Sequence, residues 1–230
     1  MGLFLDRRAA GRQLAALLGR FARQPDALVL ALPRGGVPVA YEVAAALSLP
    51  LDLFIVRKLG VPGHEELAFG AIAPGGVRVL SEELVEALGI TAADIERVTV
   101  AEERELVRRD REYREGAPPP AITGQTVLLV DDGLATGASM RAAVAAIRIH
   151  RPRRIIVAVP VATSEAIQAL RGSADDVIAV MTPKPFGSVG SWYVDFSQTT
   201  DDEVRNLLHD AKGRAATRVT PWRASSNTGG

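Results

Sequence analysis

Short runs of consecutive apolar residues alternate with amphipathic segments along most of this chain. A run without polar positions is typical of a strand buried on both faces, whereas apolar residues three and four apart indicate a helix. The predicted strands are Ala27–Leu32, Leu51–Val56, Val77–Leu80, Thr126–Val130, Arg154–Val161 and Val177–Met181. The predicted helices are one after Asp6 that carries Leu14, Leu17, Leu18 and Phe21, then Pro38–Leu47, Ala138–His150 and Ser164–Leu170. This alternation predicts an α/β fold, an open and mostly parallel sheet with helices on both faces.

Three segments depart from the alternation. Residues 57–76 are rich in glycine and proline and form a long connection, which is typical of a functional lid. Residues 81–115 carry opposite charges at helical neighbour spacing, which predicts a solvated helix ended by the sequence GAPPP. Residues 213–230 lack periodicity, so we expect a disordered tail. We therefore predict one domain over residues 1–212, with an insert at about 57–120 that contains the mobile lid.

Composition and charge narrow the class of protein. Hydrophobic residues make up 47% and charged residues 23% of the 230 residues, as in ordinary globular proteins. Basic and acidic residues number 27 each, so no bulk charge attracts nucleic acid or an anionic membrane, although a local arginine surface stays open. Cysteine is absent, no histidines stand at metal-ligand spacing, and no apolar run reaches the ~18 residues of a membrane span. We expect a soluble, cytoplasmic protein without nucleic-acid or membrane partners.

The most specific motif is LLVDDGLATGASM, residues 128–140. A buried strand leads to two adjacent carboxylates, Asp131 and Asp132, and a turn of small residues then opens a helix. Backbone N–H groups at a helix start can surround a phosphate. The turn residues are Ala135, Thr136, Gly137, Ala138 and Ser139. Carboxylates so close to a phosphate would repel it unless they accept hydrogen bonds from hydroxyls or face a divalent cation, so the motif predicts a phosphorylated sugar as ligand.

This motif resembles the ribose-phosphate signature of the type I phosphoribosyltransferases, and its Ala-Thr-Gly is similar to that of the adenine and uracil enzymes. The resemblance covers roughly residues 1–210. It implies the family's fold, with a small hood at about residues 182–200, and the donor 5-phosphoribosyl 1-diphosphate with Mg²⁺. It also implies that Asp131 and Asp132 hold the ribose hydroxyls and contact the metal directly or through donor and water, and that a homodimer forms.

A second glycine turn, LPRGGVPVA at residues 32–40, also follows a strand and opens a helix. Gly35 and Gly36 expose backbone N–H groups and Arg34 offers a charge-assisted hydrogen bond, which suits a diphosphate. The turn resembles the family's pyrophosphate loop. An ordinary glycine turn explains it equally well when it is considered alone.

The third segment, VRKLGVPGHEELAFG at residues 56–70, resembles the stretch that leads into the mobile catalytic loop of adenine phosphoribosyltransferases. Arg57 and Lys58 at the end of a strand could neutralise the diphosphate, and a lid would exclude water. Glu65 and Glu66 are candidates for an acid–base or metal group, with surface carboxylates as the alternative. We place Glu66 and Lys58 with the two aspartates as candidate catalytic residues.

Acceptor choice depends on two further features. Ala135 stands where hypoxanthine and guanine enzymes of the family place a proton-accepting aspartate, so any base must come from the lid or the substrate. The segment KPFGSVGSWYVDF supplies Phe186, Trp192 and Tyr193, which either stack on a planar acceptor or fill the interface between hood and core.

These observations predict transfer of the 5-phosphoribosyl group to an unidentified acceptor, such as a nucleobase, with release of pyrophosphate. Two alternatives stay open. One is a sensor that binds the donor without transfer, and the other is hydrolysis or phosphorolysis of a ribosyl phosphate.

Overall fold

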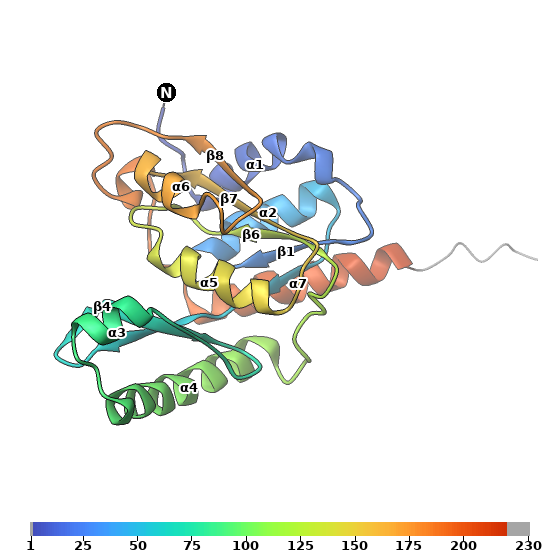
Figure 1. Ribbon diagram of the computed structural model, residues 1–230. Helices are drawn as coiled ribbons and strands as arrows, with labels where there is room; N and C mark the ends of the chain where they lie inside the picture. The colour runs from blue at the N-terminus through green and yellow to red at the C-terminus, as the bar shows by residue number, and fades with distance from the viewer. Residues whose placement is uncertain (1, 220–230) are drawn as a thin grey trace, which may run out of the picture.

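Five parallel strands form the central sheet, in the order β2-β1-β6-β7-β8 (Figure 1). The computed structural model describes the backbone of residues 2–219 and the side chains of these residues except 65, 66 and 215–219. The strands are β1 (Ala27–Ala31), β2 (Leu51–Leu53), β6 (Thr126–Val130), β7 (Arg154–Val161) and β8 (Asp176–Met181). The central pair β1 and β6 runs in register from Ala27 opposite Thr126 to Ala31 opposite Val130. The predicted parallel sheet is confirmed, although β2 ends at Leu53, before the predicted Val56.

Helices cover both faces of the sheet, as predicted. One face carries α1 (Arg7–Leu17), α2 (Gly36–Leu47) and α7 (Asp201–Val219), and the other carries α5 (Ala138–Ile149) and α6 (Ser164–Leu170). Alternate strand residues point to opposite faces. Leu128 accordingly belongs to the apolar cluster under α1 and α2, whereas Leu129 belongs to the cluster under α5. Both faces of the central strands β1 and β6 are therefore shielded from water, which explains the continuous apolar runs in the sequence.

Residues 57–114 form an arm beside the sheet, drawn in teal and green in Figure 1. The arm consists of an antiparallel sheet of β3 (Arg57–Val61), β4 (His64–Ala73) and β5 (Val77–Leu80), followed by α3 (Glu82–Ala87) and α4 (Ala92–Arg114). Residues 57–76 were predicted as a long connection without strands, but most of them form β3 and β4. Leu59, Phe69 and Ile72 are buried in the arm and supply the apolar side that its sheet needs.

Helix α4 was predicted as a solvated helix, and most of its charges are exposed, but one of its faces is buried. Leu106, Tyr113 and Arg114 lie on that face. Arg114, which is 4% exposed, donates to Asp52 (2.5 Å), to Asp110 (2.6 Å) and to the carbonyl of Leu53 (2.7 Å). This network fastens the end of the arm to the edge strand β2.

The C-terminal helix α7 continues to Val219, so the predicted tail boundary at residue 213 was wrong. Gly213 does not end the helix. Next to it, the Arg214 guanidinium lies 4.0 Å from the ring centroid of Tyr41 on α2, which holds this turn against the core. Residues 220–230 of the predicted tail lie outside the described residues. Among residues 2–219, no helix is both long enough and apolar enough to cross a membrane.

The hood segment, residues 182–200, contains one 3₁₀ turn, η2 (Val189–Trp192), and packs on the start of the chain. Phe4 forms a parallel bridge with Tyr193, and the backbone nitrogens of Val194 and Asp195 donate to the carbonyls of Phe4 and Leu5. The N-terminal segment is therefore part of the hood layer rather than a free end.

Candidate active site

The two predicted glycine loops meet at the carboxyl ends of β1 and β6. These strands are neighbours, so Gly35 and Gly36 after β1 lie against Asp131 and Asp132 after β6. A Cβ on Gly35 would stand 2.0 Å from Oδ2 of Asp132, and one on Gly36 would stand 2.9 Å from Cα of Asp131. Only glycine permits this approach. The structure thus joins the predicted diphosphate turn and the predicted sugar carboxylates into one site.

The two carboxylates have different surroundings. Asp132 accepts a hydrogen bond from Nε of Arg7 at 2.8 Å, and this ion pair is largely buried, with side chains 11% and 15% exposed. Asp131 accepts from the backbone nitrogen of Asp132 at 2.8 Å. Burial raises the pKa of Asp131 well above its usual range, and the charge of Asp132 raises it further. Burial also raises the pKa of Asp132, while the Arg7 guanidinium opposes that shift.

The predicted phosphate turn leads directly into helix α5. Gly137 is left-handed (φ 71°) and precedes the first helical residue, which exposes N–H groups at the helix start. The hydroxyl of Thr136 accepts from the nitrogen of Ala138 at 3.4 Å. The other side of the turn is held by Thr163, whose hydroxyl donates to the carbonyl of Ala135 at 2.7 Å. Ser139 is exposed at the mouth of the turn.

The arm carries the two predicted basic residues, Lys58 and Arg57, and only Lys58 lines a cavity beside this turn. Lys58 lines a cavity of about 260 Å³ between the arm sheet and α5, together with Ala138 and Arg141. Arg57 instead forms an ion pair with Glu102 on α4 at 2.6 Å, so its charge is already balanced. The side chain of Glu66, the predicted acid–base candidate, lies outside the described residues.

Arg34 also has a protein partner. Its guanidinium lies 3.7 Å from Oδ1 of Asp201 at the start of α7. The hydroxyl of Tyr113 on the arm donates to the same oxygen at 2.5 Å. Asp201 therefore connects the predicted diphosphate turn to the arm.

The hood aromatics serve mainly to pack the hood on the core. The indole nitrogen of Trp192 donates to the carbonyl of Phe186 at 2.8 Å, and both side chains pack against the buried cluster of Phe4 and Tyr193. Tyr193 is buried, and its hydroxyl donates to the backbone carbonyl of Asp132 at 2.5 Å. Of the two alternatives, filling the interface describes these contacts better than a free stacking surface does.

Sequence reasoning missed several residues of the site. Arg7 is 125 positions from Asp132, Thr163 stands in a segment without a motif of its own, and Arg141 directly follows the motif of residues 128–140. The start of α1 carried one usable signal, because Asp6 is an N-cap residue and places Arg7 in the first turn of a helix.

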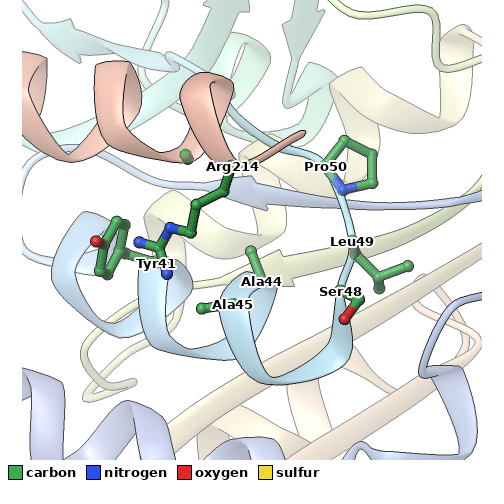
Figure 2. Close-up of a pocket in the computed structure, with 8 residues that line it drawn as sticks. Tyr41, Ala44, Ala45, Ser48, Leu49, Pro50 and Arg214 are labelled. Carbon is green, nitrogen blue, oxygen red and sulfur yellow. The ribbon is translucent and has the colours of Figure 1, made fainter. Parts of the chain in front are cut away.

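A second cavity, of about 200 Å³, lies between α2 and α7 at the other end of the sheet (Figure 2). Its walls are mostly apolar, and Arg214 extends across Tyr41 at one side of it, as Figure 2 shows. Ser48 and Pro50, beside it, precede β2, so this cavity opens away from the carboxyl ends where the aspartates lie.

Residues 5–188 match the family model of the phosphoribosyl transferase domain. The chain belongs to this family. Its fold is that of the type I phosphoribosyltransferases, a parallel five-stranded sheet flanked by helices. The crystal structure of TT1426 from Thermus thermophilus has a TM-score of 0.81 and 42% sequence identity to this phosphoribosyl transferase domain, and the match covers 91% of this chain and 99% of that chain.

Curated relatives agree with the family assignment. A Mycobacterium tuberculosis H37Rv protein, provisionally named a phosphoribosyl transferase, is 46% identical over 211 residues, which are 92% of this chain and 47% of that protein. The chain thus spans about half the length of the curated relatives it matches. The bifunctional protein PyrR of Chloroflexus aurantiacus is 41% identical over 95 residues, covering 36% of this chain and 52% of that protein.

Proposed function

We propose that this phosphoribosyl transferase domain moves the 5-phosphoribosyl group from 5-phosphoribosyl 1-diphosphate to an acceptor and releases pyrophosphate. The observation that carries the proposal is the meeting of two glycine-containing loops around two carboxylates at the ends of β1 and β6. One loop suits a diphosphate and the other suits a 5-phosphate, and these are the two groups that the ribose ring of the donor joins.

Each part of the site then has a chemical role. The N–H groups at the start of α5, with Thr136 and Ser139, hold the 5-phosphate, and Asp131 accepts hydrogen bonds from the ribose hydroxyls. The backbone at Gly35 and Gly36 binds the diphosphate. Lys58, which lines the cavity between the arm and α5 together with Ala138, adds positive charge as the bond from the anomeric carbon to the diphosphate breaks.

The residues present fit Mg²⁺ only as a metal shared with the donor. Among the side chains that the structure describes, no group of three or more histidine and carboxylate ligands forms a metal site. Asp132 is already paired with Arg7, which leaves Asp131 as the carboxylate that would hold a shared ion. Mg²⁺ prefers few protein ligands and several phosphate or water oxygens, and when bound it would neutralise the leaving diphosphate.

A second candidate function is a donor-binding sensor without transfer. The hood aromatics next to the site are engaged in packing rather than offered to a planar acceptor, which favours it. Hydrolysis of the donor is a third outcome that the same geometry would support.

The first experiment is a calorimetric titration of the purified protein with 5-phosphoribosyl 1-diphosphate, with and without Mg²⁺. The test variant is Asp131→Asn, which keeps an oxygen for the nitrogen of Asp132. The matched control is Asp176→Asn, at the amino end of β8, where the carboxylate pairs with Arg20 at the surface. We expect magnesium-dependent binding in the wild type and the control, and at least tenfold weaker binding in Asp131→Asn.

Binding by all three proteins with equal affinity, or by none of them, would overturn the proposed donor site. If the donor binds, release of pyrophosphate across a screen of acceptors separates transfer from sensing. Mass spectrometry of the products distinguishes transfer from hydrolysis, because only transfer leaves the ribosyl group on the acceptor.

A further inference from the structure

Arg7 connects three parts of the site that are distant in the sequence. Its Nε donates to Oδ2 of Asp132 at 2.8 Å, and its Nη1 donates to the carbonyl of Ser197 in the hood at 2.7 Å. Its guanidinium carbon lies 3.9 Å from the ring centroid of Phe196, in cation–π geometry. The side chain of Arg7 is 11% exposed, so its ion pair with Asp132 is largely shielded from water, whereas Phe196 and Ser197 lie at the surface.

The position of this guanidinium matters because of the charges around it. Two adjacent carboxylates stand beside turns that must bind phosphate and diphosphate, and unbalanced they would repel both anions. Oδ2 of Asp132 lies against Gly35 in the diphosphate turn, and Nε of Arg7 is close to the same glycine, 3.4 Å from where its Cβ would be. Arg7 therefore balances the carboxylate that is nearest to the diphosphate.

The same residue fixes the hood. The hood contacts the sugar-site loop at the hydroxyl of Tyr193, which donates to the carbonyl of Asp132. Arg7 adds a second attachment a few residues further along, at Phe196 and Ser197. Two attachments to one aspartate, one to its backbone and one to its carboxylate, hold the hood segment in a fixed orientation over the loop.

We propose that Arg7 is a positioning residue of the phosphoribosyl site, one that neutralises Asp132 and fastens the hood to the sugar-binding loop. The effect of Arg7 on the affinity for diphosphate ligands rests on the proposed function. The attachment of the hood by Arg7 does not. Asp132 then acts chiefly as the anchor between hood and diphosphate turn, and Asp131 is the carboxylate that receives the ligand.

The test compares Arg7→Met, which keeps the unbranched apolar stem but loses the guanidinium and its charge, with Arg7→Lys, which keeps the charge but loses the planar fork. The control is Arg8→Met on the same helix turn, because Arg8 is half-exposed and pairs with Glu42 away from the site. Hydrogen–deuterium exchange of residues 192–199 is measured without any ligand. Calorimetry with 5-phosphoribosyl 1-diphosphate and with inorganic pyrophosphate, each with Mg²⁺, is measured in parallel.

We expect exchange in the hood to become at least tenfold faster in Arg7→Met and to stay unchanged in Arg8→Met. We expect both diphosphate ligands to bind at least tenfold more weakly to Arg7→Met, and Arg7→Lys to recover part of that loss because it restores the charge. Wild-type exchange in the hood of Arg7→Met would overturn the attachment. Unchanged ligand affinity in Arg7→Met, or Arg7→Lys as weak as Arg7→Met, would overturn the charge role.

If the wild type binds neither diphosphate ligand, the proposed function fails and the charge role fails with it. The exchange measurement still decides whether Arg7 fastens the hood. The two failures are thus distinguishable.

Discussion

Replacing Gly35 with alanine tests the close approach of the two loops most directly. Gly35 has ordinary right-handed helical angles (φ −58°, ψ −31°), so alanine fits its backbone conformation. Without a steric conflict, the substitution would stabilise the fold by about 0.4–1 kcal/mol, because it restricts the unfolded chain. Any loss of stability must therefore come from the contact with Asp132.

The size of the conflict follows from the geometry. The new methyl carbon would lie 2.0 Å from Oδ2 of Asp132 and 2.8 Å from its Cγ, where ordinary contacts begin at 3.4 Å. The carboxylate must move by more than an ångström, which breaks its 2.8 Å hydrogen bond with Arg7. Overpacking of this kind costs about 1–3 kcal/mol. The restricted unfolded chain offsets part of this cost, so we expect the free energy of unfolding to fall by about 1–2 kcal/mol. This corresponds to a Tm lower by about 2–8 °C.

Thermal and urea unfolding of Gly35→Ala measures this loss, and donor titration measures its effect on the site. Gly19→Ala is the control, since a Cβ there meets nothing within 4 Å. We expect the control to match or slightly exceed the wild type in stability. A Gly35→Ala protein as stable as the control, with unchanged affinity for the donor, would refute the proposed packing of Gly35 on Asp132.

Two other predictions use the buried charges. Because burial and Asp132 raise the pKa of Asp131, the folded protein keeps this proton to a higher pH than the unfolded chain, and ionisation costs stability as the pH rises above about 4. Asp131→Asn should therefore raise the Tm at pH 7 and lose this advantage near pH 4, and calorimetry showing a lower Tm at pH 7 would contradict it. Arg114→Met removes the guanidinium partner of Asp52 and Asp110 and should cost about 3–5 kcal/mol in urea unfolding. Arg108→Met, on the exposed face of the same helix, should change stability by less than about 1 kcal/mol, and equal effects of the two substitutions would count against the anchoring role of Arg114.

The sheet was predictable from the sequence because its inner strands, β1, β6 and β7, are buried on both faces. Thr126–Val130 and Arg154–Val161 were predicted to the residue, since a continuous apolar run has one natural boundary at each end. The arm was not predictable in the same way. Its strands contain Gly60 and Gly70, and glycine argues locally for turns, whereas pairing between β3 and β4 depends on contacts that no local pattern records.

The residues of the site also differ in whether a local motif reveals them. Asp131, Asp132 and the two glycine turns are contiguous motifs, so the sequence places them together once the strands are known to be neighbours. The partners of those groups come from elsewhere. Arg7 reaches Asp132 from the first helix, and Asp201 reaches Arg34 from the last, and only the folded chain shows that Arg57 is paired with Glu102.

The pairing of β1 with β6 has a consequence for how fast the protein folds. These strands form the centre of the sheet, yet their partner residues are about 100 positions apart, with the arm between them. The chain must close this long loop before the two halves of the donor site exist, and loop closure costs entropy that grows slowly with length. The site therefore forms only when this long-range pairing forms, and contacts of this kind form slowly. A shorter arm would speed folding more than it would stabilise the native state.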